Sequence, residues 1–145
     1  MPPHIVPLQP DHRDAWERLA RGYKDFYRTP TSDEEYEAAW QRLLQQRDVF
    51  GLGAVLDGQL VGLAHYLFHG STWSPRVCYL QDLFTSPEAR GQGVARMLIE
   101  AVADEARRHG AARYYWLTQE HNETARKLYD QVAKYNGFIR YDQTL

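Results

Sequence analysis

A glycine-containing stretch in this sequence carries the pattern best suited to chemistry. It reads Arg90-Gly91-Gln92-Gly93-Val94-Ala95, and it lies between a segment with strand character and a segment with helical periodicity. Backbone N–H groups in the first turn of a helix have no helical acceptor, and the helix dipole adds positive potential there. Glycine also lets a ligand approach the backbone without interference from a Cβ atom. The stretch therefore predicts a binding site for a phosphate group.

Two familiar phosphate-binding motifs do not match this stretch. The dinucleotide fingerprint needs a third glycine where Arg96 stands, and the P-loop needs a Gly-Lys-Ser/Thr sequence that is missing here. One alternative stays open at this point. The stretch could be a plain strand–turn–helix connection in which Gly91 and Gly93 serve only the geometry of the turn.

The elements that must position this stretch follow from periodicity and from capping and turn residues. Asp11 stands at the N-cap position of an expected first helix, and Ser32 with Glu35 forms a capping box before a second one. Asp57-Gly58 predicts a tight hairpin turn. Apolar residues at helical spacing predict a third helix over 93–109. Strands are expected at 4–8, 49–56, 59–68, 76–85, 112–118 and 138–141, and a fourth helix after Asn122.

This order of elements predicts an α/β protein whose mixed sheet has helices on both faces. The length of 145 residues is that of one domain, which we expect to span 1–145. The net charge of −2 excludes a broadly basic protein that coats nucleic acid. A hydrophobic content of 43% excludes a disordered chain. Cys78 is the only cysteine, which excludes an intramolecular disulfide and a zinc site made of cysteines. We expect its side chain to be a small core residue rather than a nucleophile.

The N-terminal sequence lacks the charged and apolar regions of a signal peptide, and no apolar run is long enough to cross a bilayer. We therefore expect a cytoplasmic protein with no membrane partner and no nucleic-acid partner. His65 and His69 fall on one face of an expected strand, but no third ligand stands at a defined spacing. We expect no metal site.

Two motifs together resemble those of the GCN5-related N-acetyltransferase (GNAT) superfamily. Arg90-x-x-Gly93-x-Ala95, which follows a strand ending in Asp82-Leu-Phe-Thr85, is similar to the family's acetyl-CoA pyrophosphate loop. Asn122-x-x-Ala125-x-x-x-Tyr129 is similar to its second motif. The order of elements agrees over nearly the whole chain. The segment Tyr79-Leu-Gln-Asp-Leu-Phe resembles most closely the histone and polyamine acetyltransferase branch.

The resemblance implies a GNAT fold, in which a mixed, mostly antiparallel sheet has its fourth and fifth strands splayed apart around acetyl-CoA. The implied activity is transfer of the acetyl group to a primary amine by direct attack in a ternary complex. The amine could be a polyamine, a lysine side chain or another small amine. The implied cofactor-binding residues are Leu83, Phe84 and Thr85 along the pantetheine arm, Arg90, Gly91, Gln92, Gly93, Val94, Ala95 and Arg96 around the pyrophosphate, and Asn122, Ala125 and Tyr129 on the last helix.

Direct attack needs a proton acceptor for the amine and a proton donor for the leaving thiolate. Tyr129 matches the family's usual acid. The base is less clear, because a relative in the polyamine branch has Glu where this chain has Gln81. The open alternatives are Asp82, Glu120, His121 and a chain of water molecules. Strand alternation predicts that the side chains of Gln81 and Asp82 point to opposite faces of the sheet.

The acceptor amine is expected to bind beside an aromatic stripe on the first helix, formed by Tyr23, Phe26 and Tyr27, and beside Gln81. A homodimer is expected from the resemblance alone. Two other functions stay open. The chain could be a non-catalytic acyl-CoA sensor, which Gln81 in place of a carboxylate favours, or it could use a different acyl donor.

Overall fold

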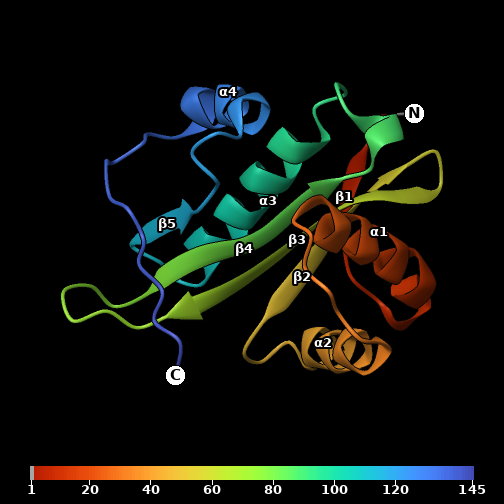
Figure 1. Ribbon diagram of the computed structural model, residues 1–145, viewed down its shortest axis with the longest axis horizontal. Coiled ribbons are helices and arrows are strands. Elements are labelled where there is room, and N and C mark those ends of the chain that lie inside the picture. Colours follow the sequence, from red (N-terminus) through yellow and green to blue (C-terminus); the bar gives the residue numbers. More distant parts are fainter. Residues whose placement is uncertain (1) are drawn as a thin grey trace.

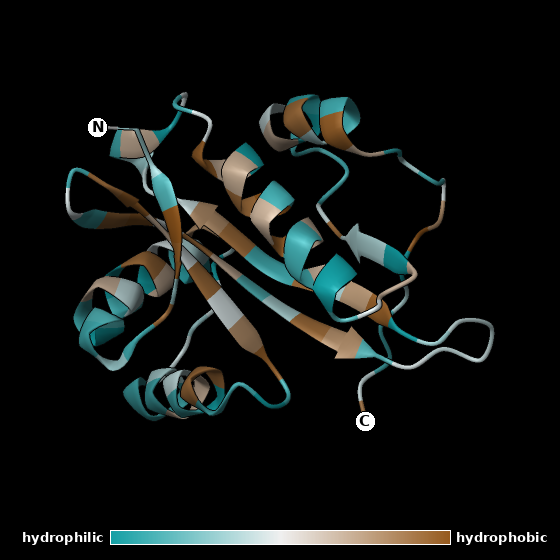
Figure 2. Ribbon diagram, turned by 180° about the vertical axis from the view of Figure 1, so that it is seen from behind, coloured by the Kyte–Doolittle hydropathy of each residue, from teal (hydrophilic) through white to brown (hydrophobic). Residues whose placement is uncertain are grey.

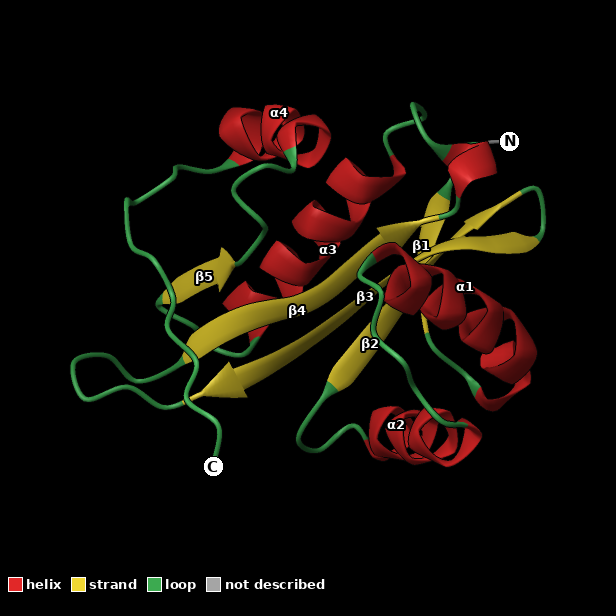
Figure 3. Cartoon of the chain, viewed as in Figure 1, coloured by secondary structure: helices red, strands yellow, loops and turns green. Residues whose placement is uncertain are grey.

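The computed structural model describes residues 2–145 of the chain (Figures 1 and 3). Its elements in chain order are β1 (His4–Pro7), η1 (Pro10–His12), α1 (Arg13–Phe26), α2 (Asp33–Gln45), β2 (Phe50–Leu56), β3 (Gln59–His69), β4 (Val77–Thr85), η2 (Pro87–Ala89), α3 (Val94–Arg108), β5 (Arg113–Trp116) and α4 (Glu123–Val132).

The strands form one sheet in the order β1-β2-β3-β4-β5. The β4–β5 pair is parallel, and the other pairs are antiparallel. Helices α1 and α2 cover one face, while α3 covers the other and α4 lies beyond β5 (Figure 1). The predicted mixed sheet with helices on both faces is confirmed. None of the helices within residues 2–145 has both the length and the apolar character that a bilayer crossing requires.

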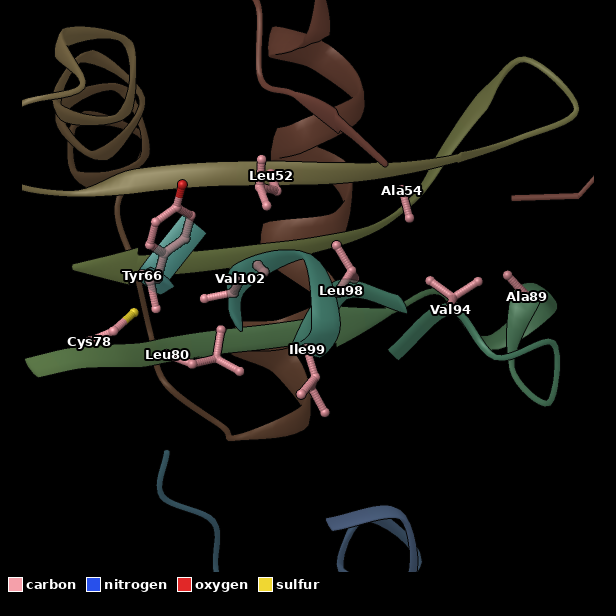
Figure 4. Close-up of a cluster of buried hydrophobic side chains, with 12 residues drawn as sticks. Leu52, Ala54, Tyr66, Cys78, Leu80, Ala89, Val94, Leu98, Ile99 and Val102 are labelled. Atoms are coloured by element: carbon pink, nitrogen blue, oxygen red, sulfur yellow. The ribbon is translucent and has the colours of Figure 1, made fainter. Parts of the chain in front are cut away.

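One apolar cluster fills the space between α3 and the sheet (Figure 4). Val94, Leu98 and Val102 recur every fourth residue on the inner side of α3, as the predicted helical periodicity requires. Gly62 on β3 sets how closely the start of this helix can approach, because a Cβ atom there would lie 2.8 Å from Val94 Cγ1. The same packing therefore holds the first turn of α3, and the loop before it, against the middle of the sheet.

A second cluster lies between the opposite face and helices α1 and α2. It is built around Trp16, whose ring centroid is 5.0 Å from that of Trp40. The expected capping box at the start of α2 is present, since Ser32 Oγ accepts from the Glu35 amide and the Glu35 carboxylate accepts from the Ser32 amide. Figure 2 shows that the helices turn their hydrophilic sides away from the sheet.

Two local predictions about turns have different outcomes. Asp57 and Gly58 both have positive φ, at 50° and 77°, which confirms the predicted hairpin turn. Asp11 is not the N-cap of the first helix, because it lies inside the short helix η1 and α1 begins only after His12. His12 Nδ1 accepts from the Gln9 amide at 2.9 Å, and this contact fixes the extra turn.

The prediction of a last strand at 138–141 is wrong. Residues 133–145 contain no helix or strand, and Phe138 is 84% exposed. A strand forms only where a neighbour supplies backbone hydrogen bonds, and this segment pairs with none of the described strands. Strand β5 is also shorter than expected, because it pairs with β4 over only four residues.

Candidate active site

The parallel pair β4–β5 separates halfway along β4. Its last paired residues are Leu80 and Trp116, yet β4 continues to Thr85 (Figure 3). The part of β4 from Asp82 to Thr85 pairs with β3 on one side and has no strand partner on the other. The expected splay of the fourth and fifth strands is therefore confirmed, and it leaves backbone groups of β4 available to a ligand.

A β-bulge at Gln81 changes which way the side chains of β4 point. Asp82 pairs with His65 and Leu80 pairs with Tyr66, so Gln81 has no partner on β3. Before the bulge, Leu80 packs in the cluster under α3. After it, Asp82 and Gln81 both line the crevice beneath α1 and α2. The prediction that these two side chains point to opposite faces is wrong, because an inserted residue interrupts the alternation on which it depended.

The loop before α3 has the backbone conformation that its glycines allow. Gly91 and Gly93 have φ of 82° and 80°, a region that favours glycine, and a Cβ atom on either would meet nothing within 4 Å. Gly93 is the N-cap residue, and no side chain caps the helix. The N–H groups of the first turn therefore face open space, flanked by the exposed side chains of Arg90, Gln92 and Arg96.

The last three residues of β4 are held from the β3 side. Leu83, Phe84 and Thr85 pair with Ala64, Leu63 and Gly62. Arg90 Nε donates to the Thr85 carbonyl oxygen at 3.4 Å, which ties the loop before α3 to the end of the strand. Thr85 Oγ1 is buried and has no hydrogen-bond partner among the described residues.

Helix α4 faces the opening from the other side. Asn122 occupies its N-cap position, but its Nδ2 donates to Thr118 Oγ1 at 3.4 Å and does not cap the helix. Ala125 and Tyr129 are both half-buried, and Val94 and Ala95 begin the facing helix α3.

The Tyr129 ring packs edge-on against Trp116, with 5.5 Å between centroids. Burial raises the pKa of Tyr129 to about 12, and nearby Tyr27 contributes. The phenol therefore keeps its proton at neutral pH, as a proton donor must.

Asp82 is an ionised carboxylate at the bottom of the crevice. His65 Nδ1 lies 2.9 Å from Asp82 Oδ2. Burial is the largest single effect and opposes ionisation, but the hydrogen bond and electrostatic interaction with His65, the Tyr23 hydroxyl and Lys24 together outweigh it. The pKa of Asp82 is consequently below its ordinary value.

The aromatic residues on α1 differ in their surroundings, since Tyr23 packs near β4 and Phe26 is exposed to solvent. The Tyr23 ring lies 4.9 Å from that of Tyr27 and 6.4 Å from that of Phe84. Phe26 is 57% exposed. The Tyr27 phenol interacts electrostatically with both Asp82 and Tyr129.

The crevice beneath α1 and α2 has a volume of about 370 Å³. Its charged lining residues are Lys24 and Arg42, which are cations, and Glu35 and Asp82, which are anions. The Glu35 carboxylate is already engaged in the capping box of α2. The space suits a small molecule better than a folded macromolecule.

The crevice is not lined by the other candidates for catalysis or metal binding, Glu120, His121, Cys78 and His69. Glu120 and His121 are exposed in the turn before α4, and neither lines the crevice. Cys78 is buried in the core, as expected, and burial raises its pKa to about 12. His69 bonds to the Tyr115 hydroxyl at 3.1 Å.

Sequence reasoning missed the part that Trp16 and His65 play beside Asp82. The indole N–H of Trp16 donates to His65 Nε2 at 2.9 Å, across 49 residues of sequence. No local pattern signals a contact between residues so far apart, because it depends on how α1 docks on the sheet.

The chain belongs to the acetyltransferase (GNAT) family, whose model matches residues 16–135. This match confirms the resemblance on which the sequence expectations depended, and it makes the protein an acyltransferase by class.

Among curated proteins, the D-amino-acid N-acetyltransferase HPA3 of Saccharomyces cerevisiae is 32% identical over 141 residues, which cover 94% of this chain and 88% of that protein. The thialysine N-epsilon-acetyltransferase of Caenorhabditis elegans is 26% identical over 132 residues, which cover 91% and 82%. Among solved structures, AAC(6')-Iy in complex with a CoA-containing bisubstrate analogue superposes with a TM-score of 0.87 at 21% identity, over 100% of this chain and 99% of that one. This structural likeness shows the shared fold.

Proposed function

We propose that the protein transfers the acetyl group of acetyl-CoA to a small primary amine, by direct attack in a ternary complex, and that the described residues act as a single N-acetyltransferase domain. The observation that carries the proposal is the opening between β4 and β5, which has the open loop before α3 at one end and the protonated Tyr129 beside it. The CoA-containing ligand of the fold neighbour AAC(6')-Iy supports the same donor.

The residues present fit acetyl-CoA, which supplies the reactive thioester when it is bound. The free N–H groups from Gly91 to Arg96 would hold the pyrophosphate, and the positive end of α3 favours its charge. The unpaired edge of Leu83, Phe84 and Thr85 would hydrogen-bond the pantetheine arm as a neighbouring strand would. On α4, Asn122 would reach the cofactor with its amide and Ala125 would pack against it.

The groups around the opening could supply the remaining chemistry. A backbone N–H of Leu83 or Phe84 would stabilise the negative charge that develops on the carbonyl oxygen. Tyr129 would protonate the leaving thiolate. A lysine-type amine has a pKa of about 10.4, so only about one molecule in 2,500 is neutral at pH 7. Its proton must therefore be removed before or during attack.

Asp82 suits an electrostatic role better than that of a strong base. Its pKa is below the ordinary value, so it holds a proton poorly at neutral pH. As an anion it would attract the ammonium form of the acceptor and stabilise the positive charge that develops on the amine nitrogen during attack. Gln81 would orient the acceptor by hydrogen bonds, and the proton would leave through water.

We propose that the acceptor is an amino acid or a similar zwitterion. The crevice balances the cations Lys24 and Arg42 against the anions Glu35 and Asp82, which suits a zwitterion better than a polycation. When its amine lies near Asp82, the acceptor would pair its carboxylate with Lys24 or Arg42. Two relatives are named for acetyl transfer to D-amino acids and to thialysine, and both acceptors belong to this class.

Release of free CoA thiol from acetyl-CoA, measured against a panel of amines, tests the activity. The panel should include D- and L-amino acids, lysine, thialysine, polyamines and aminoglycosides. We expect the zwitterions to have the highest kcat/KM. Tight acetyl-CoA binding without turnover of any amine would favour a sensor, and faster turnover with longer acyl chains would favour another donor.

We also propose that the protein forms a homodimer through its C-terminal segment. Tyr135, Phe138, Ile139 and Tyr141 are large, apolar and more than half exposed. A second copy that covered this segment would remove the apolar surface from water.

A further inference from the structure

A chain of hydrogen bonds connects α1, β3 and β4 beneath the crevice. Trp16 Nε1 lies 2.9 Å from His65 Nε2, and His65 Nδ1 lies 2.9 Å from Asp82 Oδ2. Trp16 is 1% exposed, and the His65 side chain is 14% exposed. Three side chains from three elements are thus joined end to end where water has little access.

The hydrogen bond from Trp16 decides the protonation state of His65. An indole N–H can only donate, so His65 Nε2 must be the acceptor and must carry no proton. The single proton of the neutral ring is then on Nδ1, from which it is donated to Asp82. A proton added to Nε2 would face the indole N–H and would leave that buried donor without an acceptor.

The state of His65 in turn decides how much charge Asp82 presents. Beside a neutral imidazole, Asp82 keeps its full negative charge. Beside an imidazolium, the pair would be neutral as a whole and would attract a cationic acceptor weakly. The other charged or titratable groups around this pair are Arg13, Tyr23, Lys24 and the neighbouring Tyr27 on the α1 side, Glu35, Tyr36 and Arg42 on α2, and Tyr79 on β4.

We propose that Trp16 and His65 are positioning residues for Asp82, which keep His65 neutral with its proton on Nδ1 so that the carboxylate stays available to the acceptor amine. The inference rests on the proposed function, because it assigns these residues to the same acceptor site. In this proposal neither residue meets the reacting atoms, and both act through Asp82.

Replacement of Trp16 by Phe removes the indole N–H and keeps an aromatic ring in the cluster. His65 Nε2 then has no N–H donor facing it, so a proton added there no longer breaks a hydrogen bond. We expect KM for the amine at pH 6 to rise about tenfold relative to pH 8 in this variant, with a smaller change in kcat. The native protein should lack this rise.

Trp40→Phe is the matched control. Trp40 lies in the same cluster, with its ring centroid 5.0 Å from that of Trp16, and it loses the same atoms on substitution. It is not bonded to His65 in the described structure. A purely structural role for Trp16 would give both variants the same pH profile, and that result would overturn the proposal.

Nitrogen NMR of ¹⁵N-histidine-labelled protein reads the His65 ring directly and needs no activity. The expected native spectrum has His65 as the neutral Nδ1–H tautomer from pH 8 to pH 6. An Nε2–H tautomer or an imidazolium in the native protein would overturn the proposal even if Trp16→Phe failed to fold. Lack of turnover with every amine would instead contradict the proposed function.

Discussion

Tyr129 and Asp82 hold opposite protonation states at neutral pH for different physical reasons. Burial disfavours the charged form of each group, and at Tyr129 nothing opposes it, so the pKa rises to about 12. At Asp82, burial is outweighed only by the combined interactions with His65, the Tyr23 hydroxyl and Lys24, so the pKa falls. Paired groups whose environments push their pKa values apart are typical of active sites. In the proposed reaction they would supply a proton donor for the leaving thiolate and an anion for the acceptor amine.

Tyr129→Phe should lower kcat by about tenfold or more, because the leaving thiolate would lose its proton donor. Acetyl-CoA affinity should change little, since the ring remains. Steady-state kinetics and calorimetric titration with acetyl-CoA measure the two quantities. Tyr114→Phe is the control, because the Tyr114 hydroxyl is bonded to the Ile99 carbonyl oxygen within the core. Native turnover in the Tyr129 variant would make that residue a packing residue only.

Asp82 should also make stability depend on acid pH. Its pKa is lowered on folding, so its ionised form contributes stability above the ordinary value of about 3.9, and this contribution is lost as the pH falls through the lower folded value. We expect the free energy of unfolding of Asp82→Asn to fall less than that of the native protein between pH 5 and pH 3. Urea unfolding at each pH measures the free energy of unfolding. The same pH dependence of this free energy in the two proteins would contradict the lowered pKa of Asp82.

At the scale of elements, the start of α3 is decisive, because its N–H groups follow in the chain directly after the part of β4 that has no partner on the β5 side. Gly62 lets the helix approach closely, and Arg90 ties the loop to Thr85. The bulge at Gln81 separates two jobs along one strand. Leu80 before it packs in the cluster under α3, whereas Gln81 and Asp82 line the crevice, and the edge from Leu83 to Thr85 has no strand partner on the β5 side.

Gly93→Asp should weaken acetyl-CoA binding about tenfold or more, because it places a negative charge against the pyrophosphate at the helix N-terminus. Gly58→Asp is a matched control, since Gly58 also has positive φ and open space around its Cβ position but lies in the turn between β2 and β3 rather than in the loop before α3. Calorimetric titration measures both affinities. Equal affinities for the two variants would remove the loop from the cofactor site.

At the scale of the whole molecule, the C-terminal segment leaves several large apolar side chains in water. The proposed homodimer predicts that Phe138→Ser shifts the protein toward monomer, as sedimentation equilibrium would measure. Trp73→Ser is the control, because Trp73 is 93% exposed in the loop between β3 and β4. A native protein that stays monomeric at all concentrations, or an equal shift in both variants, would contradict this interface.

The sequence by itself determined the features that depend on neighbouring residues. The Ser32–Glu35 capping box, the Asp57-Gly58 turn and the apolar side of α3 were all predicted, because each needs interactions only within a few positions. The two motifs around Gly93 and Tyr129 were likewise sufficient to predict the GNAT family.

Only the tertiary structure decided the features that depend on strand register and helix docking. The bulge at Gln81 turned Asp82 into the crevice, against the expected alternation. The bond between Trp16 and His65 joins positions 49 residues apart. The last predicted strand did not form, because a strand needs a partner and pattern alone supplies none. Contacts of this kind arise only when distant segments are packed together, so no local sequence signal specifies them.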